Sequence, residues 1–285
     1  MLPQNQHDMN HLKKLTAMNT LKYISILLFA TLLLPLQIQA QEQIAVPLSN
    51  PGEPGLLDIG VVRGSITVNG YDGKEVLVAY SGEDDQKQEV TQKGLRRISN
   101  NGVGFEVTED NNEVEVSGAS PMQSIDFEIT VPRNFGLNLS TVNGGEILVN
   151  NVNGEMEISN VNGKVTLRNV GGSALINTVN GDIKATFSKV APNSPMAFSN
   201  LNGDIDITFP ADVKINAKMK SEWGEVFTDF EMNIQRTDKK NIKSSANDGV
   251  YKVSVNNWIY GAINGGGPEY LFKSMRGDIY IRKNK

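Results

Sequence analysis

Three aspartates are the residues whose type and spacing best fit chemistry. Asp204 and Asp206 are two positions apart, so that both carboxylates would project from one face of a β-strand, and Asp182 lies one repeat unit earlier. Carboxylates grouped in this way can bind Ca²⁺ or act as an acid/base pair. The same residues also fit a solvated face that alternates with Ile205 and Ile207. We favour this second interpretation, because Asp does not recur at a fixed position of the repeat.

Four aromatic residues near the C-terminus form the second candidate site. Trp258, Tyr260, Tyr270 and Phe272 lie close in sequence to the glycine-rich segment 265–267. Aromatic rings beside such a loop can stack on sugars or dock a protein. They can equally cover the open end of a repeat array, which needs a cap. We favour the cap and keep the binding site as an alternative.

The first forty residues have the features of a secretory signal. Three lysines precede an apolar run at 24–36, which is too short to span a bilayer comfortably, and the segment ends in Ala40. Met18 is an alternative start, because 18–40 is a complete signal by itself, and an uncleaved N-terminal anchor is the alternative to cleavage. We expect an exported protein in the periplasm, on the cell surface or outside the cell, with no membrane span after cleavage.

Removal of residues 1–40 changes which chemistry is available. Both histidines, His7 and His11, lie in this segment, and the chain contains no cysteine. This composition excludes Ser-His-Asp and Cys-His catalysis and zinc sites with His or Cys ligands. The remaining chain has 24 Lys+Arg and 31 Asp+Glu, a net charge of −7, which argues against nucleic acid and anionic membranes as partners. We predict no enzymatic activity, no cofactor and no metal.

The elements that would position any site form a repeat. Glycines recur every nine residues from 145 to 181, and apolar residues stand two and four positions after each of them. Alternation of this kind is typical of short strands with one buried face. Asn-Gly pairs can turn the chain between strands. The predicted turn glycines are Gly145, Gly154, Gly163, Gly172, Gly181, Gly203, Gly224 and Gly277.

Two all-β architectures fit this pattern. In a β-solenoid each strand stacks on its equivalent in the next coil, whereas in an antiparallel meander each Asn-Gly is a hairpin turn. The identical turns and the asparagines repeated at 151, 160 and 169 favour the solenoid, because equivalent side chains can then hydrogen-bond along the stack. We predict a flexible arm at 41–55, an irregular β-rich portion or cap at 56–135, and a regular solenoid with a C-terminal cap at 136–285.

Several segments resemble a bacterial family of β-strand-repeat proteins named "putative adhesins", relatives of the auto-transporter adhesin head domain. The matching segments are 62–68, the strand end at 129–132, the Val-Asn-Gly units, and 264–267 with 277–281. The resemblance covers about residues 56–283. It implies a right-handed β-solenoid-like fold in the cell envelope or outside the cell, and it brings no catalytic residues.

We therefore expect a non-enzymatic β-solenoid with an adhesin-like or scaffolding role. Its partner would be an envelope protein or a glycan, bound through a long polar face by many shallow contacts. Two alternatives remain: a β-helical polysaccharide lyase or hydrolase that uses Asp, Lys or Arg, and a periplasmic partner of an envelope-stress signalling system. The sequence leaves the oligomeric state open.

Overall fold

The computed structural model describes residues 43–82, 91–92, 95–96, 104–117, 123–236, 243–247, 250–254 and 258–285. Regular secondary structure in these residues is β-strand throughout. In the same ranges, no helix has the length and apolar character needed to cross a membrane. The expected signal peptide at 1–40 lies outside the described residues. The predicted all-β class is thus confirmed for the described part of the chain.

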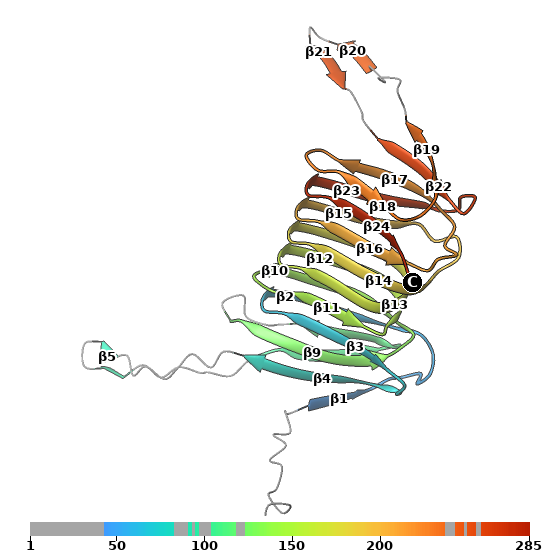
Figure 1. Cartoon of the computed structure of the whole chain (residues 1–285). Coiled ribbons are helices and arrows are strands. Elements are labelled where there is room, and N and C mark those ends of the chain that lie inside the picture. The colour runs from blue at the N-terminus through green and yellow to red at the C-terminus, as the bar shows by residue number, and fades with distance from the viewer. Residues whose placement is uncertain are drawn as a thin grey trace, which may run out of the picture. The chain divides into compact units, whose positions relative to one another are not determined.

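Most strands belong to one continuous sheet that winds into two layers, called face A and face B below (Figure 1). β13 (Val165–Asn180) contributes its first half to face A and its second half to face B. In pairing order, the other strands of face A are β1 (Gln43–Pro47), β4 (Glu75–Gly82), β9 (Ile125–Pro132), β3 (Ile66–Tyr71), β11 (Ile147–Asn150), β14 (Ile183–Val190), β16 (Ile205–Phe209), β24 (Ile279–Lys283) and β18 (Val226–Thr228).

Face B follows the same principle. In pairing order, its other strands are β7 (Glu106–Asp110), β8 (Glu113–Ser117), β2 (Gly55–Arg63), β10 (Phe135–Asn143), β12 (Asn153–Asn162), β15 (Met196–Asn202), β23 (Glu269–Arg276), β17 (Ile215–Ser221), β22 (Ile259–Ile263) and β19 (Met232–Arg236). Two further antiparallel pairs form small sheets of their own, β5 (Thr91–Gln92) with β6 (Leu95–Arg96) and β20 (Lys243–Asn247) with β21 (Val250–Ser254).

Parallel pairing decides between the two predicted architectures. On face A, Ile147 lies opposite Val165, and on face B, Met156 lies opposite Ala174. Both pairs are 18 residues apart, so that one coil consists of two nine-residue units, one on each face. The expected stacking of equivalent strands is confirmed, and the antiparallel meander is excluded for this region.

The core lies between the two faces. The apolar residues two and four positions after the glycines from 145 to 181, and after Gly203 and Gly277, point inward and are at most 3% exposed. Towards the C-terminal end, aromatic rings replace aliphatic side chains, and Phe187 stacks on Phe209 while Phe198 stacks on Phe272. Because every coil adds its own apolar layer, one hydrophobic core runs through the whole stack.

The stack begins earlier in the chain than the repeat pattern indicates. β2 pairs in parallel with β10, and β3 pairs in parallel with β11, with strand registers that match those of the later coils. Residues 43–55, for which the composition predicts a loose arm, instead include β1, which pairs antiparallel with β4. Ser49 and Asn50 are held by side chains of the β7–β8 hairpin.

The last residues of the chain do not lie at the end of the stack. β23 pairs with both β15 and β17, and β24 pairs with both β16 and β18 (Figure 1). The C-terminal segment therefore forms a coil between two coils that precede it in the sequence.

Candidate functional site

The stack has two edges, at which the chain passes from one face to the other. They differ in structure, although the same repeat motif occurs at both. We call the edge where face B leads into face A the glycine edge. At every one of its glycines except Gly64, a Cβ atom would overlap the carbonyl group of the glycine one coil away, and at Gly64 it would overlap the carbonyl group of Ile125. Close approach of the coils therefore requires glycine there. These glycines are, in stacking order, Gly64, Gly145, Gly163, Gly181, Gly203, Gly277 and Gly224.

One polar side chain per coil binds the glycine carbonyls at this edge. The donors are Thr141, Asn160, Thr178, Asn200, Ser274 and Ser221, with donor–acceptor distances of 2.8–3.5 Å. The prediction that Asn160 bonds to an equivalent residue is wrong, because its side chain is buried and donates to the backbone carbonyl of Gly145 instead. Asn151 and Asn169 do pair along the stack, with Nδ2 of Asn169 2.7 Å from Oδ1 of Asn151.

The aspartates predicted as a possible metal or catalytic site bind the protein itself. Oδ1 of Asp182 accepts from the amide of Asp204 at 3.0 Å, and Oδ1 of Asp204 accepts from the amide of Asp278 at 2.8 Å. Asp206 pairs with Arg282 at 2.7 Å, and this hydrogen bond raises the pKa of the guanidinium. Among the described residues, no group of His, Cys, Asp and Glu is arranged to hold a metal ion. These contacts tie adjacent coils together.

The four aromatic residues near the C-terminus do not share one surface. Tyr270 and Phe272 are fully buried, so their rings form no part of an aromatic surface with the other two residues. Trp258 and Tyr260 are partly exposed. The ammonium groups of Lys218 and Lys220 lie 5.1 and 5.7 Å from the Trp258 ring centroid, a distance that allows cation–π attraction.

The outer side of face B carries a long hollow that sequence reasoning did not identify. One part, of about 1030 Å³, extends over β2, β10, β12, β13, β15 and β23. A second part, of about 680 Å³, continues over β13, β15 and β23 towards the glycine edge, and both parts contain Leu271. We call the two parts together the face B groove.

Apolar side chains are exposed in and beside this groove. Leu175, Leu201 and Met275 are 40–41% exposed, and Trp223 is 78% exposed. Leu201 and Met275 occupy equivalent positions in neighbouring coils. Val142 and Val179 occupy the same position in earlier coils and are 38–39% exposed. These exposed positions include the Val of the Val-Asn-Gly units at the glycine edge, which points outward. The corresponding residues at the opposite edge, Val152 and Val170, are buried. Because the same motif occurs at both edges, the sequence does not distinguish the exposed Val from the buried one.

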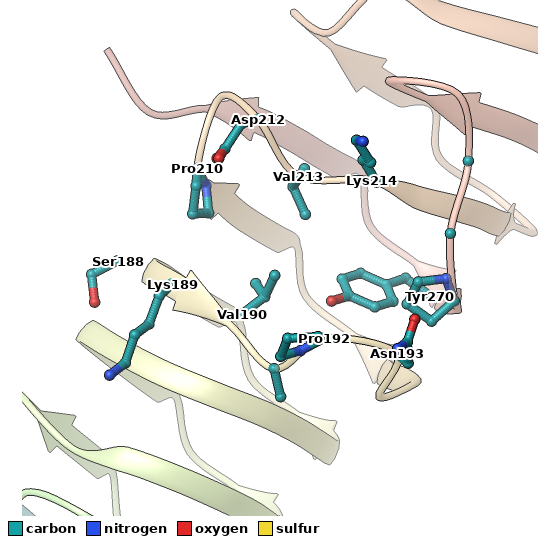
Figure 2. Close-up of a pocket in the computed structure, with 14 residues that line it drawn as sticks. Ser188, Lys189, Val190, Pro192, Asn193, Pro210, Asp212, Val213, Lys214 and Tyr270 are labelled. Carbon is teal, nitrogen blue, oxygen red and sulfur yellow. The ribbon is translucent and has the colours of Figure 1, made fainter.

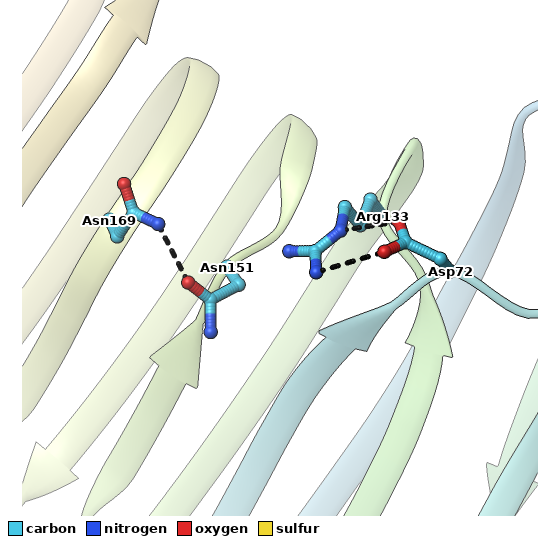
Figure 3. A network of polar contacts seen from close by, with 4 residues as sticks. All are labelled: Asp72, Arg133, Asn151 and Asn169. Carbon is cyan, nitrogen blue, oxygen red and sulfur yellow. Dashed lines mark hydrogen bonds and ion pairs between the residues drawn. The ribbon is translucent and has the colours of Figure 1, made fainter.

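The opposite edge, where face A leads into face B, is called the loop edge. Towards the N-terminal end it is closed by short turns and polar contacts (Figure 3). Nε of Arg133 lies 2.6 Å from Oδ1 of Asp72, and the guanidinium lowers the pKa of this exposed carboxyl group. Further along the stack, longer loops replace the short turns and surround a pocket of about 460 Å³ (Figure 2).

Comparison with known proteins places this geometry in context. Residues 137–258 match the family described as Toastrack DUF4097, which confirms the resemblance indicated by the repeat. No curated protein matches the chain.

Two solved structures are similar to the chain. The crystal structure of a putative cell adhesion protein from Clostridium sporogenes has 12% sequence identity and a TM-score of 0.46, over 85% of this chain and 99% of that one. That of a putative adhesin from Bacteroides fragilis has 14% identity and a TM-score of 0.38, over 85% and 96%.

Proposed function

Because residues 137–258 form a Toastrack DUF4097 domain, we propose that this protein is an exported, non-enzymatic binding protein with an adhesin-like or scaffolding role. The observation that carries the proposal is the face B groove. A hollow that crosses several coils and exposes apolar side chains suits an extended partner bound through many shallow contacts. Its partner class is an envelope protein or a glycan.

Trp223 is the residue that we expect to contribute most to the binding free energy. Among the residues that the structure describes, it is the most exposed large apolar side chain at 78%, and it lines the groove beside Leu201 and Met275. Tryptophan at an interface commonly contributes about 2 kcal/mol or more when buried by a partner. The carboxylates of Asp182 and Asp204 accept hydrogen bonds from backbone amides, and that of Asp206 is paired with Arg282. These three aspartates therefore do not support the lyase or hydrolase alternative.

The test uses the full chain against arrays of glycans and purified envelope proteins of the native host. Trp223→Ala and Leu201→Ser should each weaken binding to any ligand found by about tenfold or more. Ile44→Ser is the matched control, because Ile44 is similarly exposed at 38% but lies on β1 of face A. Binding that is equally strong in all three variants would exclude the face B groove as the site.

Localisation is tested separately by fractionation of the native host and protease treatment of intact cells. Cleavage of the protein in intact cells, or its release into the medium, is expected for an adhesin-like role. Strict confinement to the periplasm would contradict adhesion and favour a scaffold or a signalling partner inside the envelope.

A further inference from the structure

The pocket at the loop edge lies where the sequence departs from its repeat. Gly181 and Gly203 are 22 residues apart instead of 18, and the added residues form the loop that follows β14. Three loops, at 191–195, 210–214 and 264–268, contribute to the pocket wall. Insertions in repeat proteins commonly gather on one side and form binding surfaces there. The position of the pocket therefore indicates a role other than stacking.

Tyr270 supplies a buried polar group at the base of this pocket. Its side chain is fully buried, and among the described residues its hydroxyl oxygen has no hydrogen-bond partner. Figure 2 shows the ring directed from β23 into the space beside Val190 and Val213. An unpaired buried hydroxyl costs about 1–3 kcal/mol, so a hydrogen-bonding group that reaches the base of this pocket would gain by pairing with it.

The chemistry of the lining restricts what this partner can be. Burial raises the pKa of Tyr270 to about 12, so its hydroxyl stays neutral and can donate and accept a hydrogen bond. Val190, Val213 and Pro192 offer apolar contacts, while Asp212 and Asn193 add polar groups. Lys189, Lys214 and Asp212 line the pocket, so two positive charges and one negative charge leave a small formal excess of +1.

We propose that the loop-edge pocket binds one uncharged sugar ring, with a ring hydroxyl hydrogen-bonded to Tyr270. A pyranose combines an apolar C–H face, suited to the valines and the proline, with hydroxyl groups suited to Tyr270, Asp212 and Asn193. The pocket volume of about 460 Å³ lies within the usual range for small-ligand sites. The loop-edge pocket shares no lining residue with the face B groove, and the proposal does not depend on that groove.

The experiment titrates the full chain with glucose, galactose, mannose and N-acetylglucosamine, monitored by ligand-observed NMR, with inorganic phosphate and glucuronate as charged probes. At least one neutral sugar should bind with a Kd below about 10 mM. Tyr270→Phe removes only the hydroxyl and should weaken this binding about tenfold or more, because the sugar hydroxyl then loses its buried partner. Tyr280→Phe, on the outer side of face A, is the control and should bind as the wild type does.

Thermal unfolding of Tyr270→Phe separates a lost contact from a damaged fold. The midpoint should be unchanged or higher, since the variant removes an unpaired buried group. The proposal is overturned if no neutral sugar binds, if only the charged probes bind, or if Tyr270→Phe binds sugar as tightly as the wild type. If Tyr270→Phe loses binding and also has a lowered midpoint, the second variant is Asn193→Gly, which removes the side chain and tolerates the positive φ of 60° at this position. This variant must also weaken sugar binding, and unchanged binding would overturn the proposal.

Discussion

At the scale of single residues, the glycine edge depends on one polar side-chain donor in each coil, and most of these donors are buried. Thr141, Asn160 and Thr178 lie opposite one another in the strand register and donate to equivalent glycine carbonyls. Threonine uses its hydroxyl for this bond, whereas Asn160 also brings a carbonyl oxygen, Oδ1, which is buried and has no partner among the described residues. The unpaired oxygen of Asn160 therefore lowers the stability of the fold by a small amount that a substitution can restore.

Asn160→Thr should therefore raise the free energy of unfolding, by about 1 kcal/mol, because the donor is kept and the unpaired oxygen is removed. Asn160→Val should lower it by about 1–3 kcal/mol, since the carbonyl of Gly145 then loses its buried donor. Urea denaturation of the two variants and the wild type measures both changes. Equal destabilisation by Thr and Val would contradict the importance of this hydrogen bond.

At the scale of elements, the repeat glycines allow neighbouring coils to approach closely. Gly181 does not have a positive φ, yet a Cβ at this position would overlap the carbonyl of Gly163. The expectation that these glycines mainly permit a sharp turn is therefore incomplete. The requirement for glycine comes from contact with a residue 18 positions away, so a short stretch of sequence does not reveal it.

Gly181→Ala should lower the free energy of unfolding by about 1–3 kcal/mol or more, because the coils must separate to admit the methyl group. Gly104→Ala is the matched control, as a Cβ there meets nothing within 4 Å and φ is not positive. Its free energy of unfolding should stay within about 0.5 kcal/mol of the wild type. Chemical denaturation of both variants provides the measurement, and a similar loss in both would contradict the steric explanation.

At the scale of the molecule, the N-terminal end of the stack joins the two faces. Glu109, in the β7–β8 hairpin of face B, accepts hydrogen bonds from the amide and hydroxyl of Ser49 at 2.9 Å each. Ser49 follows β1 of face A. The amides of Ser49 and Asn112 lower the pKa of Glu109 below its ordinary value. The charged form of this carboxylate therefore holds the β1 segment against the hairpin.

A carboxyl group whose pKa is lowered on folding stabilises the fold above its ordinary pKa and loses this effect as the pH falls through the lowered value. We expect hydrogen exchange at the amides of Ser49 and Asn112, corrected for intrinsic rates, to increase below about pH 4. In Glu109→Gln both amides should exchange faster at neutral pH, with little further change on acidification. An unchanged acid response in this variant would contradict the role of Glu109.

Much of the fold was predictable, because a strand with one buried face must alternate and a stacked array must repeat. The nine-residue period, the inward residues and the absence of a regular metal-binding pattern all follow from residues close together in the chain. The resemblance of the repeat units to adhesin-like proteins rests on the same local features. Tyr270 and Phe272, by contrast, are residue types that are common in binding surfaces, but the structure buries both side chains.

The sequence by itself determined most of the strands and the inward face of each, since these depend on alternation and spacing. The number of strands in a coil came from the parallel register of the structure. Only the tertiary structure decided which Val of Val-Asn-Gly is exposed, where the face B groove lies, and that β23 and β24 insert between earlier coils. The physical reason is that every coil offers nearly the same edge to its neighbour. The order of the strands therefore depends on contacts between residues far apart in the sequence, such as Phe198 and Phe272. A short stretch of sequence does not show these contacts.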